Sequence, residues 1–325
     1  MHNIVSRRCG VLALVLLMAG CGGGSDAPNA PPVSVTPPPP APTPPPTSTA
    51  APSANYASAF DFSTNRSFES PLAEVRTYER YEASSPTFYV YEKSEAVLNL
   101  DPRAARFDYL VQPQTLTATI GAETTFFNQP STLSGSPGVI LTYGQNVDGE
   151  VQSFHYVRPR EDYRYVSGNR MLLSRSSHLS GPVIRWDTER YFLLGTPTLV
   201  TDVPTSGAFG YSARLSSSPA AYRGLGGFDA TSTLTFDAAT SRLTGTMLAA
   251  PVSWVTGTTP TKATLIFSGN ETDGVMKGTI SSPDSGYSGE FVGRLYGPAG
   301  AEMGIIFTLV ADNWNVAGQT TARKN

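Results

Sequence analysis

The residues that could do chemistry in this chain are few. His155 and His178 are the only histidines beyond residue 2, and neither lies at a spacing suited to metal ligands, such as H-E-x-x-H. A haem site would recruit one of these histidines, or a tyrosine such as Tyr156, as an axial ligand. A solvated or locally hydrogen-bonded histidine is the simpler interpretation. The sequence therefore predicts no metal ion and no cofactor.

Nucleophilic and acid–base catalysis also lack their usual patterns. No G-x-S-x-G motif occurs; the closest stretch, 286–289 (GYSG), lies at an expected strand start without the strand–turn–helix setting of that chemistry. The glycine-rich run 224–227 has no helix behind it to bind phosphate and is predicted to be a loop. Glu161 and Asp162 lie among arginines, which indicates a solvated loop of mixed charge. No enzyme activity is predicted.

The segment 156–165 has the composition of a protein interface. Arginine and tyrosine are enriched in binding hot spots, and they alternate closely here. Ordinary exposed strand and loop residues are the competing interpretation. Three tryptophans, Trp186, Trp254 and Trp314, could likewise anchor a partner or simply be packed. The predicted partner-binding residues are Tyr156, Arg158, Arg160, Tyr163, Arg164 and Tyr165.

The N-terminus has the pattern of an export signal. Arg7 and Arg8 precede a short apolar run, 11–18, which is too short for a transmembrane helix. The small pair Ala19-Gly20 before Cys21 resembles the bacterial lipobox, whose cysteine is lipidated and becomes the first residue of the mature protein. A plain signal peptide followed by a chance cysteine is the alternative. We expect a signal peptide over 1–20 and lipidation at Cys21.

The segment after Cys21 is predicted to be a disordered tether, residues 21–55. Twelve of the 27 prolines lie within 22–55, and almost nothing in that block could be buried. Fully extended, it would reach on the order of 100 Å. Cys9 leaves with the signal and Cys21 is acylated, so no thiol remains for a disulfide or a metal.

Charge and hydropathy limit the partners. Without residues 1–20 the chain has 21 basic and 26 acidic residues, a mild acidity that argues against nucleic acid. No later segment is apolar for long enough to span a bilayer as a helix. We therefore expect the lipid to be the membrane attachment.

From about Tyr56 the composition changes to that of an all-β protein, with a short helix over 69–81 as the one exception. Apolar and polar residues alternate in the C-terminal third, and the connectors are too short for parallel crossovers. This pattern predicts an antiparallel up-and-down barrel with a filled interior and a solvated outer face that carries Lys277, Glu290 and Arg294. The eight expected strands are 207–215, 231–237, 241–249, 262–270, 274–281, 288–297, 301–311 and 314–322.

Two passages resemble a known family. The stretch 291–304 (FVGRLYGPAGAEMG) is similar to the F-x-G-x-x-Y-G-P-x-A-x-E-x-G-G signature of the transferrin-binding protein B barrel. Upstream, 195–198 and 204–207 with Tyr211 resemble that family's connection into its first barrel strand, and 237–247 is similar to one of its hairpins. The resemblance implies a single lobe: an eight-stranded barrel over 204–325, preceded by a β-rich handle-like subdomain over 56–203. Handle strands are expected near 87–91, 96–100, 106–111, 115–120, 139–143 and 151–157.

The function that these features predict is binding. By resemblance, the chain is a lipoprotein of the outer membrane, facing the cell surface or the periplasm. It would capture an iron-carrier protein, haem or another solute, and could work with an outer-membrane transporter. The alternative is a structural or interaction lipoprotein that reuses the barrel and holds no solute.

Overall fold

The computed structural model describes residues 56–81, 89–128, 139–158, 161–177, 183–217, 224–226, 232–252, 263–311 and 314–325. The predicted signal 1–20, the lipidation site Cys21 and the tether 21–55 lie outside them. A search of the described residues finds no helix with the length and apolarity to cross a membrane.

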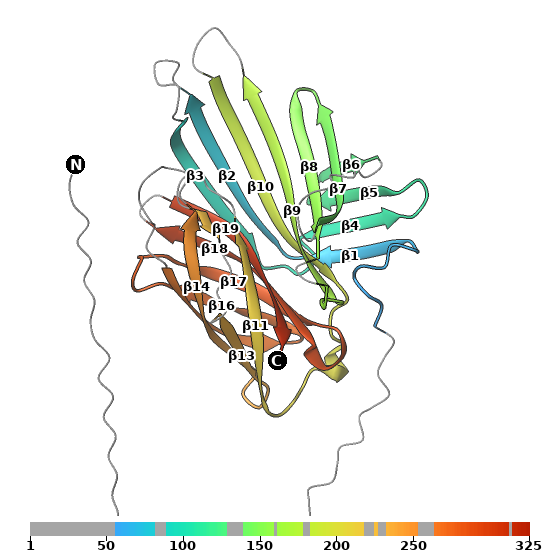
Figure 1. Ribbon diagram of the computed structural model, residues 1–325, viewed down its shortest axis with the longest axis vertical. Helices are drawn as coiled ribbons and strands as arrows, with labels where there is room; N and C mark the ends of the chain where they lie inside the picture. Colours follow the sequence, from blue (N-terminus) through green and yellow to red (C-terminus); the bar gives the residue numbers. More distant parts are fainter. Residues whose placement is uncertain are drawn as a thin grey trace, which may run out of the picture. The chain divides into compact units, whose positions relative to one another are not determined.

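Eight C-terminal strands close into a barrel (Figure 1), which confirms the predicted fold. Each strand pairs antiparallel with the next along the chain, and the last pairs with the first, so the ring has no free edge. The barrel strands are β11 (Ala208–Ser217), β13 (Thr233–Asp237), β14 (Arg242–Val252), β15 (Ala263–Thr272), β16 (Val275–Ser281), β17 (Ser288–Tyr296), β18 (Glu302–Ala311) and β19 (Trp314–Lys324).

The glycine-rich run predicted to be a loop contains a short strand instead. β12 (Gly224–Gly226) pairs antiparallel with the end of β14. The loop prediction is therefore wrong for these three residues. Backbone hydrogen bonds need no side chain. A glycine-rich segment can therefore pair with a neighbouring strand even though its side-chain pattern does not predict a strand.

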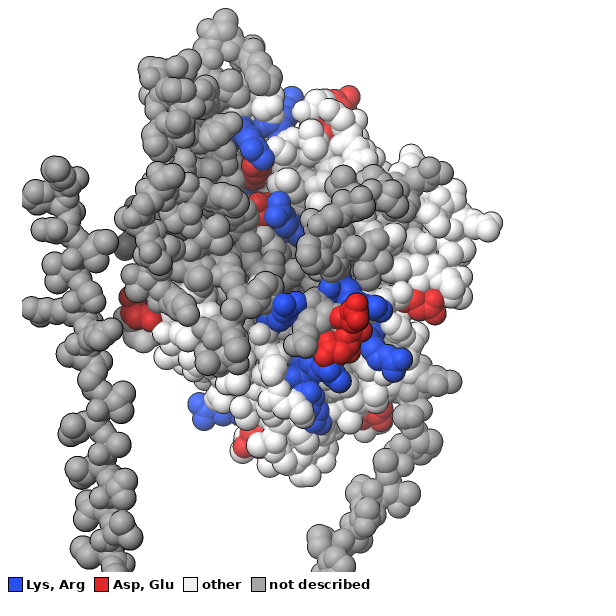
Figure 2. Space-filling model, in the orientation of Figure 1, with Lys and Arg blue, Asp and Glu red and all other residues white. Residues whose placement is uncertain are grey.

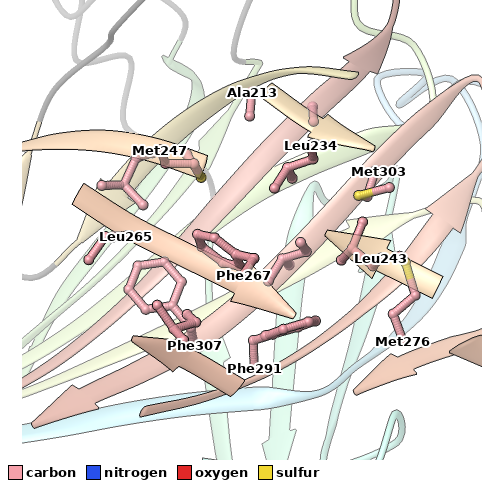
Figure 3. Packing of buried hydrophobic residues seen from close by; sticks show 14 of the residues in the cluster. Ala213, Leu234, Leu243, Met247, Leu265, Phe267, Met276, Phe291, Met303 and Phe307 are labelled. Atoms are coloured by element: carbon pink, nitrogen blue, oxygen red, sulfur yellow. The ribbon is translucent and has the colours of Figure 1, made fainter. Parts of the chain in front are cut away.

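Side chains fill the barrel interior, as the alternation predicted. Leu234, Met247, Phe267, Phe291 and Phe307 all point inward and are buried (Figure 3). The ring of Phe267 lies 5.6 Å from that of Phe291 and 6.5 Å from that of Phe307, centroid to centroid. Aromatic rings at this spacing make favourable edge and tilted contacts, so the interior is a packed core.

The outer face of the barrel is not solvated all round, contrary to the expectation from the sequence. Val292, Ile306 and Ala317 point outward from β17, β18 and β19 and are fully buried. They pack against Tyr191 and Leu193 of the N-terminal half. A second layer covers this side of the barrel, and period-two alternation alone cannot distinguish a covered outer face from a wet one.

The N-terminal half contributes two antiparallel sheets, and together they form the handle-like subdomain. The larger sheet has the order β3 (Tyr89–Asn99), β2 (Leu72–Tyr81), β10 (Val183–Gly195), β9 (Val166–Ser177), β8 (Glu150–Val157) and β7 (Val139–Val147). The smaller sheet has the order β1 (Arg66–Ser70), β4 (Ala105–Leu110), β5 (Thr115–Ile120) and β6 (Glu123–Phe127).

The six-stranded sheet is the middle layer of the molecule. One face packs on the barrel through Ala73, Val75 and Tyr191, and the other packs on the four-stranded sheet through Phe154 and Phe192. The boundary that the sequence placed at 203/204 falls in the connection between β10 and β11, next to the 3-10 turn η1 (Val200–Asp202). A second turn, η2 (Pro298–Gly300), joins β17 to β18.

The short helix expected over 69–81 is wrong; β1 and β2 occupy this range, with Pro71 between them. β2 pairs with β3 on one side and with β10 on the other, so it is a central strand. Its Ala, Glu and Arg residues favour a helix, but the free energy of this preference is small for each residue. Sheet pairing on both edges outweighs that preference.

Asp284, in the turn between β16 and β17, gives a pH-dependent prediction. Its carboxylate accepts hydrogen bonds from the Thr264 backbone N–H at 2.9 Å and the Ser282 hydroxyl at 2.7 Å. Hydrogen bonds from the Thr264 side chain, the Ser282 hydroxyl and the Thr264 backbone N–H lower the pKa of Asp284 from 3.8 to about 2. Because the folded state favours the ionised form, the stabilisation is complete above about pH 4 and is lost as the pH falls towards 2.

The carboxyl carbon of Asp284 should therefore titrate near pH 2 in an NMR titration of the folded protein. Asp284→Asn should remove that part of the acid-induced loss of stability. Titration at the ordinary aspartate value would contradict the hydrogen-bonded geometry.

Candidate partner-binding surface

The six-stranded sheet is longer than the four-stranded sheet that covers one of its faces. Along β10, Trp186, Arg190 and Phe192 point to that same face, because alternate residues of a strand share a side. Phe192 is buried beneath the smaller sheet, whereas Trp186, further along, is 41% exposed. The end of the face around Trp186 is therefore open.

An aromatic pair lies on this open part. Tyr78 of β2 is the register partner of Trp186 of β10, and their rings meet edge to face with centroids 5.8 Å apart. Each ring restricts the other, so little side-chain entropy remains to be lost on binding. Rigid tyrosine and tryptophan side chains at a surface are typical binding anchors.

Arginine and apolar side chains surround the pair. Arg76 precedes Tyr78 on the same face of β2, and Arg175 of β9 is the other register partner of Trp186. Val97 of β3, opposite Glu74, is 59% exposed. We call Arg76, Tyr78, Val97, Arg175 and Trp186 the open face. Its composition matches that of interface hot spots.

A series of ion pairs connects the strands of the open face to the four-stranded sheet. The buried Arg190 guanidinium donates to Glu74 at 2.6 Å and to Glu123 of β6 at 2.7 Å. The other oxygen of Glu74 accepts from Arg76 at 2.8 Å. One guanidinium thus connects the two sheets at the margin of the open face and fixes the strands that carry the aromatic pair.

Two of the tyrosines predicted to bind a partner have structural roles. Tyr156 is buried, and its hydroxyl donates to the Ala59 carbonyl at 2.7 Å. Tyr163 is also buried and donates to the Thr321 carbonyl of β19 at 3.3 Å; burial raises the pKa of Tyr163 to about 12. Neither ring is on the surface in this structure. Contact of these two residues with a partner stays a prediction.

The remaining members of the predicted segment lie at the joint between handle and barrel. The Arg158 guanidinium lies 4.4 Å above the Phe60 ring, and Tyr165 packs edge to face on Tyr56. Arg164 is exposed. Arg160 lies outside the described residues. For Arg158, Arg164 and Tyr165, contact with a partner stays a prediction.

Glu302 at the start of β18 fixes this joint. Its carboxylate accepts backbone N–H bonds from Arg164 at 2.6 Å and from Tyr165 and Val166 at 2.8 Å. Burial raises the pKa of Glu302, and the three donors act in the opposite direction. A carboxylate from the barrel thus satisfies three consecutive amides of the handle.

Glu302→Gln should lower the free energy of unfolding by about 2 kcal/mol, because an amide has one acceptor oxygen and leaves a buried N–H without a partner. Urea denaturation measures this loss. Glu290→Gln, an exposed position of β17, is the matched control and should change stability by no more than about 0.5 kcal/mol. Equal effects of the two substitutions would contradict a special role for Glu302.

The histidines and metal-ligand side chains can be placed only in part. No group of three His, Cys, Asp or Glu side chains in the described part of the chain could hold a metal ion. Burial lowers the pKa of His155, with Arg170 contributing. The Tyr156 hydroxyl is already bonded to a carbonyl, and His178 lies outside the described residues.

The sequence singled out Trp186 but missed Tyr78. Tyr78 was included in the expected helix 69–81, and only the strand register brings it to Trp186. A cross-strand aromatic pair is invisible until both strands are assigned.

The fold and the open face define a handle-and-barrel β protein with an exposed aromatic surface. In architecture the chain has two antiparallel sheets followed by a closed eight-stranded barrel, the arrangement that the sequence predicted.

Comparisons with known proteins give remote matches. No family model and no curated protein matches the chain. Intact Ap-TbpB, with its N and C lobes, matches at 10% identity and TM-score 0.40, over 80% of this chain and 78% of that one. The N-lobe of lactoferrin-binding protein B from Moraxella bovis matches at 10% and 0.39, over 78% and 99%. Isotype 1 transferrin-binding protein B from Neisseria meningitidis matches at 11% and 0.38, over 77% and 43%. These scores are too low to transfer a partner or a binding residue.

Proposed function

We propose that this protein is a lipid-anchored binding protein of the outer membrane that captures a protein partner on its open face. The observation that carries the proposal is the exposure of Trp186 beside Tyr78 on a sheet face whose other end the four-stranded sheet covers. An unpaired aromatic surface on a rigid sheet costs solubility and is retained where it binds something. The lipobox at Cys21 supports the anchor.

A protein fits the open face better than a small solute does. Small ligands are held in concave pockets that bury most of their surface, whereas a sheet face offers a broad, shallow platform. The barrel interior, the other place for a solute, is filled by side chains. By the sequence resemblance, the partner is an iron-carrier protein. Solved proteins of similar architecture are named for binding transferrin and lactoferrin.

The decisive experiment measures binding of immobilised, unlipidated mature chain to iron-loaded transferrin, iron-loaded lactoferrin and haem. Trp186→Ala and Tyr78→Ala should each weaken binding of the protein carrier tenfold or more, the typical loss at a hot spot (about 1.4 kcal/mol and above). Their free energies of unfolding should fall by no more than about 1 kcal/mol, because Trp186 is exposed and Tyr78 is only half-buried.

Phe126→Ala is the matched control, since Phe126 is 48% exposed on β6 of the smaller sheet, away from the open face. It should leave binding unchanged. An equal loss in all three variants would count against the open face. Absence of binding to any iron carrier would favour the structural lipoprotein that holds no solute.

Protease treatment of intact cells tests the location. We expect cleavage of the folded part in whole cells, because a receptor for an external carrier must face outward. Protection in whole cells, with cleavage after the outer membrane is opened, would assign the protein to the periplasm and remove external carriers as partners.

A further inference from the structure

Three segments meet at the end of the six-stranded sheet that is farthest from Trp186: the first described residues, the β8–β9 connection and β19. The first described residues contact the β8–β9 connection, where the Ala59 N–H donates to the Arg164 carbonyl at 2.7 Å. Arg66 of β1 donates to the Ser58 carbonyl at 2.6 Å. β19 joins them through the ion pair of Arg323 with Asp162. The N-terminal segment therefore enters the folded unit at this place.

Arginines gather around this junction. We call the set the arginine base: Arg66, Arg158, Arg164, Arg214 and Arg323. Figure 2 shows basic side chains around a small acidic group in the region where β8 and β10 end in Figure 1. Arg214 approaches Tyr163 from β11, and its register partner Thr321 lies two residues from Arg323.

The arginine base has an excess of positive charge. Four carboxylates accompany its five guanidinium groups: Asp61, Glu161, Asp162 and the buried Glu302. The Arg164 side chain is exposed, and the Arg158 guanidinium lies over the Phe60 ring. The Nε atom of Arg158 is buried without a hydrogen-bond partner. The chain as a whole has a formal net charge of −3, so this local excess opposes the overall sign.

The arginine base and the open face occupy opposite ends of the handle. β10 spans Val183–Gly195, and Gly195 pairs with Val166, two residues from Arg164. Trp186 lies nine residues before Gly195 along this strand, a separation of about 30 Å at roughly 3.3 Å per residue. The end of the handle where the N-terminal segment enters is basic, and the far end of the handle is aromatic.

We propose that the arginine base binds the phosphate-bearing headgroups of an anionic lipid bilayer. Arginine pairs with phosphate oxygens through two parallel N–H bonds, and basic groups near an anionic surface each add to the attraction. The contact would direct the open face away from the bilayer. The proposed function enters only in saying which membrane is bound, the outer membrane. The affinity for anionic lipid does not depend on it.

The test uses the mature chain 21–325 with Cys21→Ser, so that no lipid is attached, in co-sedimentation with vesicles. We expect binding to phosphatidylcholine vesicles that contain phosphatidylglycerol, none to phosphatidylcholine alone, and a steep loss on adding salt. The double variant R158Q/R164Q should bind at least tenfold more weakly, since each cation near the surface is worth roughly a fivefold change.

Two further variants separate local charge from other effects. R158K/R164K keeps both charges and should retain most of the binding. R242Q/K277Q removes two exposed charges from β14 and β16 and should bind like the parent chain. Trp186→Ala should leave vesicle binding intact even if it abolishes capture of a carrier, so the two proposals fail separately.

Three results would overturn the inference. They are equal binding by R158Q/R164Q and R242Q/K277Q, no preference for the anionic vesicles, and displacement from them by millimolar inorganic phosphate at constant ionic strength. The last would identify a site for free phosphate instead of a bilayer.

Discussion

Arg190→Ala is expected to lower the free energy of unfolding by about 3–5 kcal/mol, the typical cost of removing one partner from a buried ion pair. The Arg190 side chain is 6% exposed and that of Glu74 8%, so Glu74 would lose its buried partner in a place that water does not reach. Glu123 would also lose the contact that joins β6 to β10. Urea denaturation monitored by tryptophan fluorescence measures the change.

The same reasoning predicts non-additivity. In the double variant Arg190→Ala with Glu74→Ala no buried charge is left unpaired, so the loss should be smaller than the sum of the two single losses, by about 1–3 kcal/mol. Arg103→Ala is the control, because its pair with Glu69 is exposed on both sides and such pairs contribute about 0–1 kcal/mol. Additive losses for Arg190 and Glu74 would contradict a coupled buried pair.

Arg190 also explains why the handle was harder to predict than the barrel. In β13 and β17 the inward positions are apolar and most outward ones are polar, so alternation predicted these strands directly. In β2 and β10, Glu74 and Arg190 occupy buried positions. Ion pairs satisfy these charges, but the polar residues disrupt the alternation on which strand prediction depends.

The candidate site shows the same limit. The Arg- and Tyr-rich segment around Tyr156 had the composition of an interface, yet Tyr156 and Tyr163 are buried in a joint between layers. Composition reports which residues can make strong contacts and does not distinguish contacts within the chain from contacts with a partner. Trp186 was identified as a candidate anchor, but its exposure depends on where the four-stranded sheet ends.

The glycines of the barrel lead to the second large effect. Gly269 and Gly278 are register partners on β15 and β16, and the Phe291 ring lies over both. A Cβ atom on Gly278 would lie 2.7 Å from that ring and 2.2 Å from the Ser268 carbonyl oxygen. Two neighbouring strands thus omit side chains at the place that one aromatic ring fills.

Phe291→Ala should therefore lower the free energy of unfolding by about 3–5 kcal/mol, because one wall of the cavity is glycine backbone that cannot move in to fill it. Gly278→Ala should cost about 1–3 kcal/mol or more through overpacking. Combined with Phe291→Ala, the added methyl group would no longer meet the ring, although its contact with the Ser268 carbonyl would remain. The glycine substitution should then cost about 1 kcal/mol less than it does alone. Val310→Ala, on the exposed outer face of β18, is the control and should stay within about 0.5 kcal/mol. If the cost of Gly278→Ala were the same with and without the ring, the glycine pair would serve strand pairing alone, and Phe291 would not be the reason for it.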